Sequence, residues 1–287
     1  MSANPSLSLN PIADLRQLFA FPFMVNALEA GTIVAVLASV VGWYVVLRRQ
    51  TFASHTLSVM AFPGATGAAL AGLPISLGYY LACTLAALAL GPTSRGSRRR
   101  YGSETATIGT VQTVGLAAGF LFLSLNQAVL GGPDSLLFGT FLGITRSQVL
   151  ILLAVAVASL GALTALARPL LFASVDREVA RASGVPVALV DAGFLLILAL
   201  AIAATSQLTG ALLVFALLVT PPACAQLVTM RPLAGLALSV GFALAIVWLG
   251  LGIAYFTIYP IGFYITTLAF GLYLLLRVSR AVRERRR

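Results

Sequence analysis

The chain has 287 residues, of which 60% are hydrophobic and only 9% are charged, and its formal net charge is +10. A water-soluble domain carries about 25% charged residues, so this chain lacks the polar side chains that would cover a surface in water. Apolar segments of roughly 20 residues recur along nearly the whole length, which is the pattern of an all-α polytopic membrane protein. The composition therefore excludes a water-soluble domain.

The order of apolar segments predicts three regions: an extracytoplasmic tail over 1–22, a transmembrane domain over 23–276 and a basic cytoplasmic tail over 277–287. Nine spans are expected, or eight if one is misread. Their predicted bounds are 23–47, 52–73, 77–90, 105–125, 148–166, 187–204, 208–228, 233–256 and 261–276. Prolines predict a kink at Pro63 in the second span and a break at Pro221-Pro222 in the seventh.

All basic residues of the chain are arginines, and they cluster between the apolar segments. When Arg48-Arg49 is placed in the cytoplasm and the sides alternate, every arginine except Arg16 and Arg146 lies on the cytoplasmic side, including those of the basic loop over 95–100. This distribution follows the positive-inside bias, so the N-terminus is predicted outside and the C-terminus inside. Arginines spaced along the chain in this way favour a role in topology over nucleic-acid binding, and no nucleic-acid partner is expected.

Several enzyme classes do not fit the sequence. The single histidine, His55, excludes a two-histidine zinc motif, and no Gly-x-Ser-x-Gly elbow is present. The chain also has no phosphate loop, so any ATP and Mg would be used by a separate partner, and no cofactor is expected on this chain. An intramembrane enzyme would require a second catalytic group. A membrane scaffold without a transport path is a further alternative.

The stretch over 168–186 is the one internal stretch with several charges of both signs. It has the order of a short, capped helix: a serine cap, acids in the first turn, an arginine near the end and a glycine at the C-terminal cap. These positions are Ser174, Asp176, Glu178, Arg181 and Gly184, and the helix is expected to start near Val175. Such a helix is either a solvated loop or a docking site for a soluble partner.

Three blocks of the sequence carry a family resemblance. The first is Val45-Val-Leu-Arg-Arg-x-x-Phe52, with Leu57-Ser58 and Pro63-Gly64 after it. It resembles the second-span signature of permeases of the metal-type ABC importers, the zinc, manganese and iron uptake family. Leu171 to Val187 is similar to their coupling helix, and Gly210-Ala-Leu-Leu-Val-x-Ala-Leu-Leu-Val-Thr-Pro221 is similar to a late helix. The similarity spans about residues 23 to 280.

The resemblance implies a metal-type ABC permease fold in the cell membrane of a bacterium. Two permease chains would enclose a translocation path for a divalent metal ion (Mn, Zn or Fe), and an extracytoplasmic binding protein would deliver the ion. ATP-binding cassette ATPase subunits would dock on the coupling helix near 172–185. The coupling residues implied are Asp176, Arg177, Glu178, Arg181 and Gly184.

The second span departs from the family at its ligand pair. Family members carry an aspartate and, four residues on, a histidine, a spacing that places both on one helical face. The aligned residues here are His55 and Val59, and a valine side chain has no lone pair. The predicted path residues are His55, Ser58, Val59, Glu29 and Asn26, with His55 and Glu29 as candidate metal ligands.

Three interpretations of the altered pair stay open. The permease moves a metal ion that His55 and Glu29 bind, it moves a metal chelate or other small solute, or its path has no fixed ligand. Glu29 also fits an interfacial carboxylate, and His55 a polar residue hydrogen-bonded near the cytoplasmic side. Asp191, in the first turn of the sixth span, is expected only to cap it.

Overall fold

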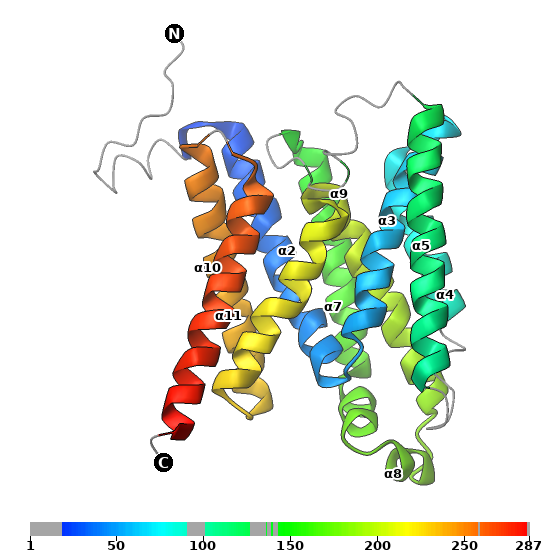
Figure 1. Ribbon diagram of the computed structural model, residues 1–287, viewed down its shortest axis with the longest axis vertical. Helices are drawn as coiled ribbons and strands as arrows, with labels where there is room; N and C mark the ends of the chain where they lie inside the picture. The colour runs from blue at the N-terminus through cyan, green and yellow to red at the C-terminus, as the bar shows by residue number, and fades with distance from the viewer. Residues whose placement is uncertain are drawn as a thin grey trace.

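The structure, a computed structural model, describes the backbone of residues 19–90, 101–126, 136, 139, 143–257 and 259–285, and the side chains of all of these except 101–105, 107, 208, 212 and 285. The tail over 1–18, the basic loop over 95–100 and the last two arginines lie outside these residues. The described chain is a bundle of helices (Figure 1). The helices are α2 (Pro22–Leu47), α3 (Thr51–Leu70), α4 (Ile75–Leu90), α5 (Tyr101–Leu125), α7 (Arg146–Val175), α8 (Arg177–Ala182), α9 (Val187–Val228), α10 (Pro232–Tyr255) and α11 (Ile261–Arg285).

Most of these helices have the length and hydropathy of membrane spans. Seven stretches of the described residues qualify: they lie in α2, α5, α7, α10 and α11 and in each half of α9. The apolar α4 is shorter, at 16 residues, and α3 is less apolar because it carries His55 and several hydroxyl side chains. The all-α polytopic membrane fold predicted from the sequence is confirmed.

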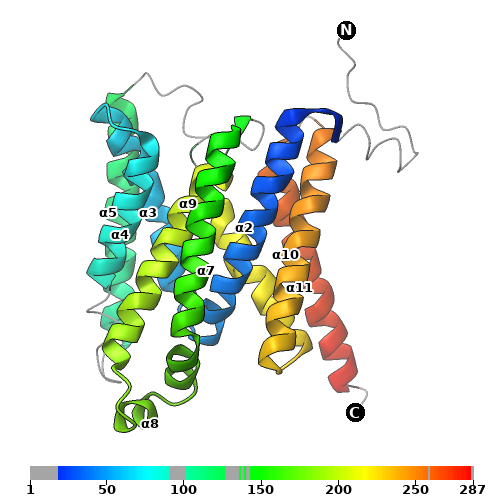
Figure 2. The same cartoon turned by 180° about the vertical axis from the view of Figure 1, so that it is seen from behind.

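The central element is α9, which contacts α2, α3, α4, α7, α10 and α11. Its 42 residues form two helical limbs joined at Gly210, whose φ of 75° and ψ of 159° are nearly restricted to glycine. Figures 1 and 2 show the limbs as an inverted V whose apex lies at the end of the bundle opposite α8. We call the two ends of the bundle the α8 end and the far end.

The break predicted at Pro221-Pro222 is not found, because the break of α9 lies at Gly210, and a milder kink at these prolines stays a prediction. The backbone of α9 stays helical through both prolines, because a proline φ is compatible with a helix, and Gly210 alone departs from helical angles inside α9. Pro63 likewise lies within the continuous helix α3. The kink predicted at Pro63 stays a prediction.

Close contacts between helices depend on glycines. A Cβ atom added to Gly64 of α3 would lie 2.4 Å from the carbonyl oxygen of Gly78 of α4, so no side chain fits between these backbones. A Cβ atom on Gly42 of α2 would lie 1.8 Å from the carbonyl oxygen of Leu218 in α9. Pro222 has no N–H, so this Leu218 carbonyl has no helical donor and packs against the Gly42 backbone instead. Small residues of this kind bring membrane helices together.

Two helices are longer than the predicted spans. The span predicted over 148–166 is part of α7, which continues through Pro169 to Val175. The span predicted to end at 276 is part of α11, which continues to Arg285. The start of α2 lies at the far end and the end of α11 at the α8 end (Figure 1). This agrees with termini on opposite sides of a membrane, while the side that each faces stays a prediction.

Candidate functional site

His55 lies in the second turn of α3 and is half-buried. Its ring meets the ring of Phe215, in the second limb of α9, nearly edge-on, with centroids 4.6 Å apart and an interplanar angle of 62°. The His55 Nδ1 atom is buried and has no hydrogen-bond partner among the described residues. The imidazole is thus positioned by an aromatic contact and keeps Nδ1 available as a donor of a lone pair or of a proton.

The other predicted path residues of α3 are buried in the single chain. Val59 is 5% exposed, and Ser58 is fully buried with its hydroxyl donating to the His55 carbonyl oxygen at 2.8 Å. The Val59 side chain offers no ligand atom, but the Val59 carbonyl oxygen can serve as one. In a regular helix this oxygen would accept a hydrogen bond from the N–H four residues later, and that residue is Pro63, which has no N–H. His55 and this carbonyl lie one turn apart on α3.

The predicted path residues of α2 lie elsewhere, near its first turns at the far end. The Asn26 amide donates to the carbonyl oxygen of Ile144 at 3.1 Å, and Glu29 forms an ion pair with Arg146 at the start of α7. Both side chains of that ion pair are largely solvent-accessible, at 40% for Glu29 and 62% for Arg146. Asn26 and Glu29 therefore tie α2 to the beginning of α7.

Glu29 and His55 do not form one metal site within this chain. Glu29 precedes the end of α2 by 18 residues, whereas His55 follows the start of α3 by four, and the two helices run in opposite directions. At 1.5 Å per residue the two side chains are separated by roughly 20 Å along the bundle. Among the described residues, no three histidine, cysteine or acidic side chains gather in a cluster that could hold a metal ion.

The short charged helix is α8, and its N-cap is Asp176. The Asp176 carboxylate accepts hydrogen bonds from the backbone N–H groups of Glu178 and Val179, both at 3.0 Å. The cap predicted at Ser174 is wrong, because Ser174 still belongs to the last turn of α7, where its hydroxyl donates to the Leu170 carbonyl. An N-cap requires an extended backbone, which Asp176 has, with φ of −143° and ψ of 107°.

The C-terminal end of α8 agrees with the sequence prediction. Gly184 has a φ of 82° and follows the C-cap residue Ser183. The N–H of Val185 reaches the carbonyl of Ala180 at 3.0 Å, and the N–H of Gly184 reaches that of Arg181 at 3.1 Å. These two bonds make a Schellman motif, for which a glycine in the left-handed region is the usual residue. Asp176, Glu178 and Arg181 are exposed on α8, which lies beyond the ends of the longer helices (Figures 1 and 2).

Asp191 is the residue whose role the sequence missed. Its side chain is 2% exposed, and its two oxygens form ion pairs with Arg48, which is 5% exposed, and with Arg177. Arg48 also donates to the Ser174 hydroxyl at 3.4 Å and stacks over the ring of Phe194 at 5.2 Å. Burial lowers the pKa of the Arg48 guanidinium, and the Asp191 carboxylate acts in the opposite direction.

The interpretation of Asp191 as a simple helix cap is therefore wrong. Its carboxylate joins the end of α2, the start of α8 and the start of α9. The partners lie 143 and 14 residues away in sequence, so local helix chemistry could not reveal them. The available signal was an acidic residue inside an apolar span, which requires a partner.

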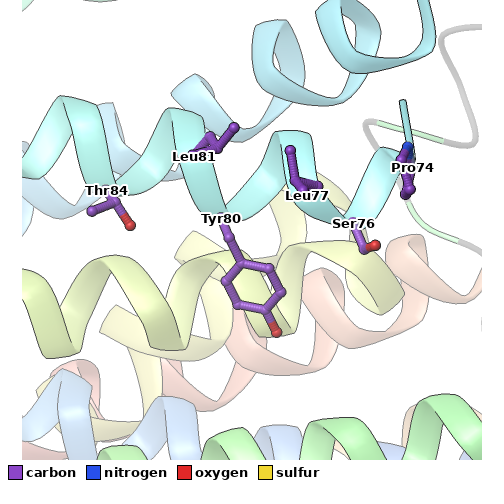
Figure 3. Close-up of a pocket in the computed structure, with 6 residues that line it drawn as sticks. All are labelled: Pro74, Ser76, Leu77, Tyr80, Leu81 and Thr84. Atoms are coloured by element: carbon purple, nitrogen blue, oxygen red, sulfur yellow. The ribbon is translucent and has the colours of Figure 1, made fainter. Parts of the chain in front are cut away.

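A second polar feature was also missed. Ser76 and Tyr80 of α4, Gln148 of α7 and Gln207 of α9 line a cavity between these three helices. Figure 3 shows Ser76 and Tyr80 projecting from one side of α4, whereas Leu77 and Leu81 project from the other. These are neutral side chains scattered over three spans, which a charge-based reading of the sequence does not detect.

A bundle of apolar helices with a broken central helix, polar side chains inside the spans and an exposed, capped helix at one end defines a polytopic membrane protein of the transport class. The ABC 3 transport family matches residues 20–279, and the chain belongs to this family. The resemblance drawn from the sequence motifs is thus confirmed.

The chain is also similar to named membrane proteins and to a solved structure. The chain is 30% identical over 217 residues to the manganese transport system membrane protein MntC of Halalkalibacterium halodurans, covering 75% of this chain and 73% of that protein. It is 31% identical over 217 residues to the chelated iron transport system membrane protein YfeC of Yersinia pestis, covering 76% and 72%. Among solved structures, PsaBC from Streptococcus pneumoniae in complex with Fab has a TM-score of 0.81 at 26% identity and covers 92% of this chain and 94% of that chain.

Proposed function

We propose that this chain is the permease subunit of an ATP-driven importer whose substrate is a divalent metal ion, manganese or iron. The observation that carries the proposal is the similarity, over about three quarters of the chain, to membrane proteins named for manganese and chelated iron transport. Because metal uptake requires no covalent chemistry from a permease, the chain would act as a transport subunit and not as an enzyme. The ion would be its substrate.

The translocation path would pass His55 on α3. Its unpartnered ring nitrogen and the Val59 carbonyl freed by Pro63 would replace the aspartate and histidine of the family pattern. An imidazole nitrogen suits iron, and a carbonyl oxygen suits manganese. In a dimer of two such permease chains, each donor would be present twice around the path. The side chains of Ser58 and Val59 would pack behind it.

Further partners follow from the two ends of the bundle. ATPase subunits, which would bind ATP and Mg, would dock on the exposed surface of α8, where Asp176, Glu178, Arg181 and Gly184 lie. The fifth predicted coupling residue, Arg177, is partly buried and pairs with Asp191, so it would act behind the docking surface. A binding protein would deliver the ion at the far end. The distribution of arginines supports a cytoplasmic α8 end, and hence an extracytoplasmic far end, in the cytoplasmic membrane of a bacterium.

Uptake measured in proteoliposomes that contain the permease, its ATPase and its binding protein tests this proposal. The complex should accumulate manganese or iron only with internal ATP. His55→Ala should lower the uptake rate roughly 10- to 100-fold, since a lost ligand should cost at least as much as a lost outer-shell partner. Glu29→Ala removes an exposed ion pair, so it should leave uptake unchanged and cost less than about 1 kcal/mol of stability. Glu284→Ala, which breaks the exposed pair with Arg280 on α11, is the matched control.

Three results would change the conclusion. If the proteoliposomes take up an iron chelate but none of the free manganese, iron and zinc ions, the substrate is a chelate. If His55→Ala transports at the wild-type rate, the path has no ligand at that position. If no metal species is transported or stimulates ATP hydrolysis, the metal proposal is wrong.

A further inference from the structure

We infer that Asp191 is a positioning residue that couples α8 mechanically to the turn between α2 and α3, and so to the helix that carries His55. The inference rests on the proposed function, in which an ATPase docked on α8 moves that helix. The residues involved are one buried carboxylate and two arginines from separate elements.

The two arginines, which belong to α2 and α8, bind different oxygens of the Asp191 carboxylate. Arg48, at the C-cap of α2, pairs with Oδ1 of Asp191, and Arg177, the first residue of α8, pairs with Oδ2. Asp191 itself lies in the second turn of α9. A displacement of Arg177 therefore acts on the same carboxylate that holds Arg48, and neither arginine can shift far without breaking a charge-assisted pair.

The turn after Arg48 transmits that constraint to α3. Only Arg48, Arg49 and Gln50 separate α2 from α3, and Arg49 has a φ of 56°, a left-handed conformation that costs a non-glycine residue energy. The N–H of Gln50 binds the Val45 carbonyl at 2.9 Å, and the N–H of Arg49 binds the Val46 carbonyl at 3.1 Å. This closed turn makes the last turn of α2 and the first turn of α3 one rigid corner, and His55 lies one turn beyond it.

The apolar contact between α8 and the spans is small. The one buried residue of α8, Ala180, packs with Ala173 and Val187 and with the partly buried Val185, all small side chains that contribute little apolar area. The ion pair Arg177–Asp191 joins α8 to the spans. Buried ion pairs are seldom the most stabilising way to join helices, and they are better suited to fixing one relative position. The triad of Asp191, Arg48 and Arg177 has this character.

The test uses the complete complex of permease, ATPase and binding protein. Arg177→Gln removes the α8 arm of the triad and leaves Asp191 paired with Arg48, so the fold is kept. Arg177→Lys keeps the charge. Arg280→Gln, at the same end of the bundle, breaks an exposed arginine–carboxylate pair of 2.9 Å and is the matched control. The measurements are co-purification of the ATPase, basal ATP hydrolysis and its stimulation by loaded binding protein, and ions transported per ATP.

Arg177→Gln should retain the ATPase and hydrolyse ATP at the basal rate, but its stimulation and its ions transported per ATP should fall by at least roughly fivefold, the lower bound of typical allosteric coupling. Arg177→Lys should recover most of the coupling, Asp191→Asn should lose at least as much as Arg177→Gln, and Arg280→Gln should match wild type. The inference is overturned if Arg177→Gln stays coupled, or if it loses the ATPase, because Arg177 would then act in docking. A wild-type complex that moves no metal ion refutes the proposed substrate only, since stimulation by the binding protein still reports coupling.

Discussion

Gly42→Ala is expected to destabilise the bundle, although a glycine-to-alanine change at an unpacked position in a helix normally stabilises it. The added Cβ would lie 1.8 Å from the Leu218 carbonyl oxygen, and both the oxygen and the glycine belong to helical backbone, so no side chain can rotate away. Ordinary contact begins near 3.4 Å. The helices α2 and α9 must therefore separate by about 1.6 Å, and a gap of even 1 Å already removes about half of the dispersion energy between facing atoms.

We expect a loss of more than about 3 kcal/mol, above the usual cost of overpacking. Unfolding by SDS in mild detergent measures it, with the fluorescence of the neighbouring Trp43 as the probe. Gly161→Ala in α7 is the matched control: a Cβ there would meet no atom within 4 Å, and alanine's helix propensity should add up to about 1 kcal/mol of stability. If Gly42→Ala unfolds at the same SDS fraction as wild type, the packing argument for α2 and α9 is refuted.

Two further predictions concern the ends of helices. Gly210→Ala should cost about 1–3 kcal/mol in the same unfolding measurement, because its φ of 75° and ψ of 159° exclude a Cβ, and an unchanged midpoint would contradict the break in α9. Asp176→Ala should quicken amide hydrogen exchange at Glu178 and Val179 roughly fivefold through loss of the cap. Ser174→Ala should leave these two amides unchanged, and the opposite result would restore Ser174 as the cap.

The spans were predictable because their signal is physical and long. A lipid bilayer requires about 20 apolar residues per helix, and the predicted segments all coincide with observed helices. The helix ends were less predictable. The bilayer thickness sets a minimum length for a span, so it does not distinguish a helix that stops at residue 166 from one that continues to Val175. In α9 both a glycine and a proline pair could interrupt the helix, and the sequence does not say which one does. At Gly210 the glycine prevailed because only it adopts the required angles.

The candidate site was predicted only in part. The C-terminal end of α8 was found from residue type and spacing, because Gly184 lies there as expected, whereas the N-cap was placed two residues too early. The role of His55 in the path stays a prediction. The partners of Glu29 and Asp191 were missed because ion pairs across a bundle leave no periodic signal in one sequence. The carbonyls freed by Pro63 and Pro222 are backbone groups, and their neighbours become visible only when the helices are packed.

The inverted V of α9 makes its first limb a long lever arm, so a small rotation at the apex displaces the α8 end of this limb by a large distance. The first limb, from Val187 to the apex at Gly210, is about 35 Å long at 1.5 Å per residue. A rotation of only about 5° about the apex would sweep the base of this lever arm, where Asp191 lies, through about 3 Å, which is the diameter of one water molecule. A displacement the size of one water molecule at the α8 end would therefore need only a small rotation at Gly210, with no residue of either limb leaving its helical conformation.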